Sequence, residues 1–326
     1  MENQELFNNR TDLSDLRNAV EQLRREIAKI VVGQHQMVDL ILSAILADGH
    51  VLIEGVPGVA KTLTAKIVAR TISSAFSRIQ FTPDMMPSDV LGTSIFNVKN
   101  SEFEFKKGPI FSNIVLIDEI NRAPAKTQSA LFEVMEERQI TIDGKTYKMD
   151  APFIVLATQN PVEQEGTYRL PEAQLDRFIY KIEIGYPSME EEEKILTGFH
   201  QRHSSNDLSL ISPVLSGEQI QHYREKVNNI HIDQNLLRYI SQLVNQTRNN
   251  SALYLGASPR ASIAIMRGAK AMAAMRGRDF VTPEDIKDVA YPVLGHRIML
   301  TAEKEMEGVT AKDIIKDIIT KIEVPR

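Results

Sequence analysis

A short segment near residue 58 carries the residue types that bind the phosphates of a nucleotide. Residues 55–62 have the sequence GVPGVAKT, between an apolar run at 50–54 and a segment at 63–73 that is typical of a helix. A strand, a glycine-bearing turn and a helix start present backbone N–H groups and a positive helix end to phosphate oxygens. The pattern predicts that Lys61 reaches the β- and γ-phosphates and that Thr62 holds Mg²⁺.

The predicted nucleotide contacts cover the whole loop and the first residue after it. They are Gly55, Val56, Pro57, Gly58, Val59, Ala60, Lys61, Thr62 and Leu63. Ala60 departs from the general pattern, because a glycine is usual immediately before the lysine. The nucleotide site therefore needs support from a second motif.

The second motif lies at 113–122 and has the sequence NIVLIDEINR. Its apolar run is typical of a strand buried on both faces of a parallel sheet. Asp118, at the end of this run, is predicted to hold the Mg²⁺ that Thr62 also binds, and Glu119 to polarise the attacking water. The alternative is a buried glycine turn beside a solvated acidic pair. The presence of both motifs together favours nucleotide binding.

Composition sets broad limits on the class of protein. The chain has 326 residues, enough for two domains, and its 43% hydrophobic and 25% charged residues are ordinary for a globular protein. It contains no cysteine, which excludes disulfides and thiolate metal sites. We expect a cytoplasmic protein without membrane insertion, because neither an export signal nor a long apolar run is present. The net charge of −5 argues mildly against nucleic acid as a partner.

Strands and helices alternate through the first part of the chain. Further strands are predicted at 78–82 and 153–157, and a helix at 125–138. Alternating residues predict hairpins at 94–106 and 139–149, the second with a favoured Asp-Gly turn. An amphipathic helix with apolar residues from 16 to 30 is expected to pack on the domain behind it. This pattern predicts an α/β fold with a mostly parallel sheet, helices on both faces and ligands at the carboxyl ends of the strands.

The pattern changes at about residue 185, and the sequence beyond it is typical of helices without convincing strands. We therefore predict a nucleotide-binding core with an N-terminal helix at 1–186 and a helical domain at 187–326. Capping boxes at Ser188 and Ser216 and the Thr282-Pro283 pair mark helix starts in the second domain. The alanine- and methionine-rich segment 261–275 is expected to pack closely against its neighbours.

Three polar residues outside both motifs are candidates for the catalytic site. Asn160 follows the strand expected beside the acidic one, where its side chain would orient the attacking water. Arg177 lies in the segment LPEAQLDRF at 170–178, and Arg260 lies in GASPRA at 256–261, at the start of a helix. A surface salt bridge is the alternative role for Arg177.

Together these segments resemble the MoxR family of AAA+ ATPases over about residues 31–297. In that family GxPGxAKT is the usual phosphate loop, so the resemblance makes Ala60 a mark of the lineage. It implies a AAA+ P-loop NTPase core, in which helices sandwich a parallel sheet with inserted β-hairpins, followed by a small all-α lid domain. The two hairpins resemble the helix-2 insert and the pre-sensor-1 hairpin of a clade that includes magnesium-chelatase ATPase subunits and replicative helicases.

The resemblance also implies residue roles. Asn160 would be sensor 1, and Arg260 would be sensor 2, touching the γ-phosphate of its own subunit. Arg177 would be the arginine finger, which stabilises charge on the nucleotide of a neighbouring subunit. Val32 and Gly33 lie in a segment that resembles the one against adenine, with an ordinary helix end as the alternative. An arginine used in trans implies a homo-oligomer, and the family usually forms hexameric rings.

The implied function is Mg²⁺-dependent ATP hydrolysis that drives a chaperone-like ring. Its protein client would be remodelled or matured, through complex assembly or the insertion of a cofactor or metal, with a partner carrying a von Willebrand factor A domain. Phe96, Phe103 and Phe105 are candidate client contacts, and packing within the hairpin is their alternative role.

Two other functions remain open from the residues. A DNA-translocating motor would need basic hairpins, and the hairpins carry Lys99, Lys106, Lys107, Lys145 and Lys148. A nucleotide-gated scaffold would bind ATP without turnover. The intact Lys61, Asp118 and Glu119 argue against the scaffold.

Overall fold

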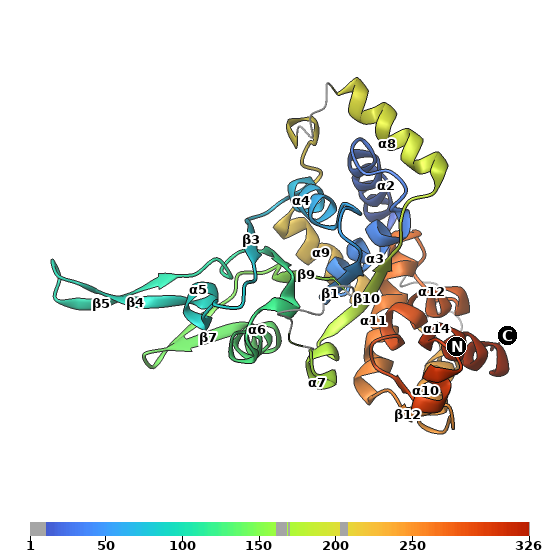
Figure 1. Cartoon of the computed structure of the whole chain (residues 1–326). Coiled ribbons are helices and arrows are strands. Elements are labelled where there is room, and N and C mark those ends of the chain that lie inside the picture. The colour runs from blue at the N-terminus through green and yellow to red at the C-terminus, as the bar shows by residue number, and fades with distance from the viewer. Residues whose placement is uncertain (1–10, 161–167, 169, 203–207, 326) are drawn as a thin grey trace, which may run out of the picture.

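The computed structural model describes residues 11–160, 168, 170–202 and 208–325 (Figure 1). Its central element is a five-stranded sheet in which all neighbouring strands run parallel. In spatial order the strands are β10 (Phe178–Ile184), β1 (His50–Gly55), β9 (Ile154–Gln159), β6 (Ile114–Asp118) and β3 (Phe76–Gln80). This arrangement confirms the predicted α/β class and parallel sheet.

Helices lie on both sides of this sheet and beyond its edge (Figure 1). Before β10 they are α2 (Ser14–Ala28), α3 (His35–Leu46), α4 (Lys61–Thr71), α5 (Pro87–Leu91), η1 (Ile120–Arg122), α6 (Ala125–Glu137) and α7 (Glu172–Leu175). After β10 they are α8 (Met189–Gln201), η2 (Leu208–Leu210), α9 (Gly217–Asn228), α10 (Gln234–Arg248), α11 (Pro259–Met275), α12 (Pro283–Leu294), α13 (Ala302–Met306) and α14 (Ala311–Lys321). No helix in these described ranges is long and apolar enough to cross a membrane.

Two apolar cores form, one on each face of the sheet. Along β6 the side chains alternate, so that Ile114 and Leu116 join one core and Val115 and Ile117 join the other. Helices α3 and α4 contribute to the first core, and α5 and α6 contribute to the second. A strand covered on both faces is apolar throughout, which explains the continuous run before Asp118.

The amphipathic helix predicted near the N-terminus is α2. Its apolar stripe is buried, as expected for a helix that packs along one face: Leu16, Val20, Leu23 and Ile27. It packs against α4 of the core and α11 of the C-terminal part. The helix therefore joins both parts of the chain.

Both predicted hairpins are present, and they extend in the same direction away from the sheet (Figure 1). They pair β4 (Gly92–Asn97) with β5 (Glu102–Lys107), and β7 (Gln139–Ile142) with β8 (Lys145–Lys148). Asp143 and Gly144 both have positive φ, at 52° and 73°, as a two-residue hairpin turn requires. A hydrogen bond between the side chains of Ser94 and Asp143 links the two hairpins.

The three phenylalanines of the first hairpin differ in exposure. The Phe105 ring lies 4.5 Å from that of Tyr147, between ring centroids, so Phe105 packs between the hairpins. Phe96 and Phe103 contact each other edge to face and remain 48% and 69% exposed. Packing is therefore the role of Phe105, while the other two rings are available to a partner.

Strand β10 was not predicted from the sequence. From Tyr180 to Ile184 its apolar and charged residues alternate, and Lys181 and Glu183 occupy the less buried positions. The Lys181 ammonium pairs at 3.0 Å with the carboxylate of Glu54 on the neighbouring β1. A cross-strand ion pair thus links the two strands at these positions.

The expectation of a wholly helical second part was also incomplete. Short strands pair β11 (Leu215–Ser216) with β2 (Ile72–Ser73), and β12 (Leu253–Leu255) with β13 (Met299–Leu300). They are too short to carry a recognisable alternation. The predicted capping boxes at Ser188 and Ser216 are present, and Thr282 caps α12, which begins at Pro283 as predicted.

Helix α11 approaches the sheet closely, as its small residues predict. A Cβ at Gly268 would overlap the hydroxyl group of the buried Tyr180 on β10. That hydroxyl lies 2.9 Å from the Ser43 hydroxyl of α3. The absence of a side chain at Gly268 thus lets α11, β10 and α3 meet.

Candidate functional site

Two motifs and Asn160 meet at one edge of the sheet. The phosphate loop follows β1, the acidic pair ends β6, and Asn160 follows β9, which lies between them. The carboxyl ends of β1, β6 and β9 lie at the same edge of the sheet because the strands are parallel. They surround a cavity of about 390 Å³ lined by Pro57, Gly58, Ala60, Lys61, Thr62, Leu63, Arg78, Gln80, Asp118, Glu119, Thr158 and Asn160.

The remaining predicted loop residues lie behind this cavity. Gly55 and Val59 are buried, and Val56 is partly buried against the apolar core. They therefore shape the loop, whereas the residues from Pro57 to Leu63 other than Val59 face the cavity.

Lys61 is the first residue of α4, and its ammonium group stays close to the loop. It donates hydrogen bonds to the carbonyl oxygen of Gly55 and, at 3.3 Å, to that of Gln159. The start of α4 adds backbone N–H groups and the positive end of the helix dipole. This combination of charges fits the phosphates of a nucleotide.

Ala60 caps α4 in the left-handed backbone region, with φ 60° and ψ 21°. Glycine adopts this conformation without penalty, whereas alanine pays about 1–2 kcal/mol for the contact of its Cβ with the following carbonyl. The backbone therefore keeps the shape that the general pattern assigns to glycine, and the alanine does not distort the loop.

Thr62 and Asp118 lie next to each other at the bottom of the cavity. The Thr62 hydroxyl donates to Asp118 Oδ1 at 3.1 Å, and the Thr158 hydroxyl donates to the same oxygen at 3.1 Å. Arg78 Nε donates to the other carboxylate oxygen at 2.6 Å. Mg²⁺ usually binds through hydroxyl and carboxylate oxygens together with substrate phosphates, so these residues fit the predicted metal.

Glu119 is held in an uncommon conformation. Its φ of 57° and ψ of 52° are left-handed, and its backbone N–H donates to the Thr158 hydroxyl at 3.0 Å. Its carboxylate pairs with Arg122 Nε at 2.8 Å. Strained non-glycine residues concentrate at functional sites, and here the strain directs a carboxylate into the cavity.

Arg78 and Thr158 escaped the sequence analysis. Thr158 contacts the Asp118 carboxylate and the backbone N–H of Glu119, and Arg78 donates to an oxygen of Asp118. The signal for Thr158 was a polar residue at the end of an otherwise apolar strand. Arg78 had no comparable signal, because a charged residue on an edge strand is ordinary.

The two residues predicted to contact adenine lie elsewhere. Gly33 has a φ of 77° and lines a separate cavity of about 490 Å³, together with Ile184, Gly185 and Glu191. Val32 is partly buried beside Gly33. The two cavities share no lining residue among those described. The adenine contact therefore stays a prediction.

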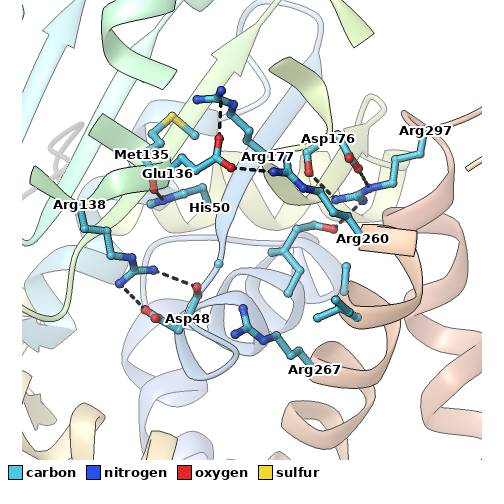
Figure 2. Close-up of a pocket in the computed structure, with 14 residues that line it drawn as sticks. Asp48, His50, Met135, Glu136, Arg138, Asp176, Arg177, Arg260, Arg267 and Arg297 are labelled. Carbon is cyan, nitrogen blue, oxygen red and sulfur yellow. Dashed lines mark hydrogen bonds and ion pairs between the residues drawn. The ribbon is translucent and has the colours of Figure 1, made fainter. Parts of the chain in front are cut away.

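Arg177 and Arg260 meet at a third cavity, of about 330 Å³, shown in Figure 2. Nη2 of Arg177 pairs at 2.9 Å and Nη2 of Arg260 pairs at 2.6 Å with the two carboxylate oxygens of Glu136. Arg177 also donates to the carbonyl oxygen of Phe132. This cavity and the phosphate-loop cavity have no described lining residue in common. The two arginines are brought together, but neither lies with Lys61.

His50 closes the floor of the arginine cavity. Burial, reinforced by the nearby Arg138, lowers the pKa of His50 to about 4. Its Nδ1 accepts from the backbone N–H of Val155 at 2.9 Å, which leaves Nε2 to donate to the Met135 carbonyl oxygen at 3.1 Å. The ring is thus a neutral structural element at neutral pH.

Comparisons with known proteins show the family to which the chain belongs. The profile of the ATPase family associated with various cellular activities (AAA) matches residues 50–180, and that of the AAA lid domain matches residues 245–318. The chain is 43% identical to "Chaperone MoxR1" of Mycobacterium tuberculosis over 314 residues, covering 92% of this chain and 81% of the relative. The chain belongs to the MoxR family of AAA+ ATPases. Family membership implies nucleotide binding, and MoxR proteins are typically oligomeric.

Other relatives cover nearly the whole chain. "Protein MoxR" of Methylorubrum extorquens is 30% identical, with 96% of this chain and 97% of the relative covered. "Uncharacterized protein YeaC" of Bacillus subtilis is 47% identical, with 95% of each covered. A crystal structure of a candidate ATPase from Cytophaga hutchinsonii has a TM-score of 0.87 and 46% identity, and covers 95% of this chain and 96% of that one. The MoxR fold thus extends through both the core and the lid.

Proposed function

We propose that this MoxR protein hydrolyses ATP with Mg²⁺ and that a hexameric ring uses the energy to remodel or mature a protein client. The observation that carries the proposal is the single cavity in which Lys61, Thr62, Asp118, Glu119 and Asn160 meet. These residues supply the groups that phosphoryl transfer to water requires, and segments far apart in the chain contribute them.

Each residue has a separate task. Lys61 and the N–H groups at the start of α4 bind the phosphates, and Thr62 and Asp118 hold the metal. Mg²⁺, when bound, neutralises charge on the phosphate oxygens. Glu119 accepts a proton from the attacking water, and the buried Asn160 fixes the orientation of that water. Thr158 holds the Asp118 carboxylate and the backbone of Glu119 in place through its two hydrogen bonds.

We also propose that Arg177 and Arg260 both serve the nucleotide of a neighbouring subunit. For Arg260 this replaces the contact within one subunit that the resemblance implied. The support is their common position on Glu136, in a cavity apart from the subunit's own phosphate loop. Arginines from a neighbour would complete the site only in a ring, which accords with the oligomeric habit of the family.

The client side of the proposal rests on the first hairpin. Phe96 and Phe103 form an exposed aromatic pair on an element that projects from the core (Figure 1). The name of the Mycobacterium tuberculosis relative, a chaperone, supports a protein client. The proposal also includes a partner with a von Willebrand factor A domain and the insertion of a metal or cofactor into the client. It further includes a cytoplasmic location and a domain boundary between residues 186 and 187.

The hairpins do not favour the DNA motor over the protein client. The first hairpin carries Glu102 and Glu104 beside its lysines, and Glu104 accepts hydrogen bonds from Asn97 at 2.9 Å and Asn100 at 3.3 Å. A motor would show strong DNA binding that weakens with salt and stimulates hydrolysis. We expect neither effect when duplex and single-stranded DNA are added to the ATPase assay.

The deciding experiment measures phosphate release from ATP with Mg²⁺ and compares Glu119→Gln with the wild type. We expect turnover to fall at least about 100-fold while nucleotide binding persists, because the general base is lost and the phosphate contacts remain. Glu133→Gln, an exposed residue on α6, is the control for an equal change of charge. A wild-type protein that binds but never hydrolyses ATP would establish the scaffold instead.

A further inference from the structure

Glu136 neutralises two arginines that come from different parts of the chain. Arg177 follows α7 in the core, and Arg260 lies in the first turn of α11 in the lid, yet each donates to one oxygen of the same carboxylate (Figure 2). A terminal phosphate is also expected to accept hydrogen bonds from two guanidinium groups, each on a different oxygen. Glu136 therefore holds the arginines as an anionic ligand would.

A second network fixes the backbone beside both arginines. The carboxylate of Asp176 pairs with Arg297 Nε at 2.6 Å and accepts from the Ser258 hydroxyl at 3.0 Å. Ser258 caps α11 and accepts from the backbone N–H of Arg260 at 3.2 Å. Asp176 precedes Arg177 directly, so this network clamps the start of α11 to the Arg177 segment without using Glu136.

The two contacts therefore differ in how easily they exchange. Arg297 is buried, with only 3% of its side chain exposed, and it also donates to the carbonyl oxygens of Phe178 and Ile179. The side chains of Glu136, Arg177 and Arg260 are 34%, 27% and 55% exposed. Ion pairs this exposed are weak and can be replaced by a competing anion, while the buried clamp stays intact.

We propose that Glu136 is a stand-in for the γ-phosphate of the neighbouring subunit's nucleotide. It keeps Arg177 and Arg260 aligned while no nucleotide is present, and it releases them when the phosphate arrives. This inference rests on the proposed use of both arginines in trans. Its consequence is that Glu136 competes with ATP, so that the apparent affinity of the ring for ATP is lower than its intrinsic affinity.

The inference is tested with Glu136→Gln, which keeps the shape of the side chain and removes its charge. Glu137→Gln is the matched control, because Glu137 is the next residue on α6, is exposed, and forms no ion pair with another described residue. We expect Glu136→Gln to lower the KM for ATP about three- to tenfold, with a much smaller change in kcat, because a partly exposed ion pair contributes little more than this.

A second readout does not depend on turnover. Sedimentation of the wild-type and variant proteins across an ATP titration reports the ATP concentration at which rings assemble. We expect Glu136→Gln to assemble at an ATP concentration several-fold lower than Glu137→Gln. Glu136→Ser, in which the carboxylate is absent and the side chain is shorter, replaces the glutamine variant if that variant does not fold.

The outcomes separate the inference from the proposed function. Suppose that the wild-type ring hydrolyses ATP and that Arg177→Ala abolishes this hydrolysis. If Glu136→Gln then leaves the KM for ATP unchanged or raises it, the competition is refuted and the ATPase proposal stands. A KM increase would mean that Glu136 orients the arginines in the active state. If the wild-type protein hydrolyses no ATP and assembles no ring with ATP, both proposals fail together.

Discussion

At the scale of single residues, arginines occupy the carboxylates of the nucleotide site. Arg78 donates to Asp118 at 2.6 Å, and Arg122 pairs with Glu119 at 2.8 Å. Paired in this way, the acidic residues are kept from repelling each other beside the phosphate loop. A bound Mg²⁺ would draw on the same Asp118 carboxylate that Arg78 pairs with, so the metal and the arginine would compete for its charge.

The first prediction follows from this competition. Arg78→Gln is expected to lower the Mg²⁺ concentration for half-maximal nucleotide binding by a few-fold, because a half-exposed ion pair contributes at most about 1 kcal/mol. Titration of a fluorescent ATP analogue with Mg²⁺ measures the effect. Arg70→Gln, at the exposed end of α4, is the control. A higher Mg²⁺ requirement in Arg78→Gln would show that Arg78 assists phosphate binding instead.

The second prediction concerns His50 and pH. The pKa of His50 is about 4 in the folded protein and 6.5 in the unfolded chain. Between pH 4 and pH 6.5 the unfolded chain therefore binds more protons than the folded protein. Stability from His50 is therefore complete above pH 6.5 and is lost as the pH falls towards 4. Between pH 7 and pH 5 this residue alone should cost about 2 kcal/mol of unfolding free energy.

Urea unfolding of the wild type and of His50→Gln at both pH values measures this contribution. Glutamine retains one donor and one acceptor for the Met135 and Val155 backbone groups, so the variant should lose less stability between pH 7 and pH 5 than the wild type does. His222→Gln, on the exposed side of α9, is the control. Equal pH dependence in all three proteins would contradict the buried neutral ring.

At the scale of elements, close approach of α11 to β10 unites the lid with the core. Gly268 provides the space for the Tyr180 hydroxyl, and Ser258 and Arg297 join Asp176 on either side. These contacts come from α11 and its N-cap, the segment after α12 and the segment before β10, so the lid is fixed to the sheet edge at several points. This rigidity keeps Arg177 and Arg260 at a constant separation.

The third prediction tests the close approach. Gly268→Ala is expected to destabilise the protein by about 1–3 kcal/mol, because its Cβ overlaps the buried Tyr180 hydroxyl. Adding Tyr180→Phe should recover part of the loss. Thermal or urea unfolding measures both. Gly198→Ala on α8 would meet only the flexible end of Arg202, so it should be neutral or slightly stabilising. Equal effects at the two glycines would show that packing at α11 is loose.

At the scale of the whole molecule, the two groups of proposed catalytic residues lie apart within one subunit. The phosphate loop and acidic pair line one cavity, and the paired arginines line another. In a ring with heterologous contacts, the second cavity of one subunit would face the first cavity of the next. One subunit alone would then be inactive.

The fourth prediction examines this division with mixed rings. Arg260→Ala subunits keep an intact phosphate site, and Glu119→Gln subunits keep intact arginines. Random mixing should restore about a quarter of wild-type turnover, the share of interfaces that combines the two intact halves, as an arginine acting in trans requires. Phosphate release is measured after mass spectrometry has shown that mixed rings form. No restoration in such rings would return Arg260 to its own subunit's nucleotide.

What the sequence by itself determined is local. Three contiguous segments have backbone conformations that neighbouring residues set: the phosphate loop, the acidic pair and the hairpin turn. Their elements were predicted correctly. The parallel sheet followed from the alternation of elements, since parallel strands need covering helices. These features required no knowledge of distant partners.

Only the tertiary structure decided which charges meet. Arg78 lies on Asp118, and Glu136 joins Arg177 to Arg260, across separations of up to 124 residues along the chain. The Lys181 ammonium of β10 likewise meets the Glu54 carboxylate of the neighbouring β1. An ion pair is favourable only when both groups are placed in three dimensions, and no local pattern encodes that placement.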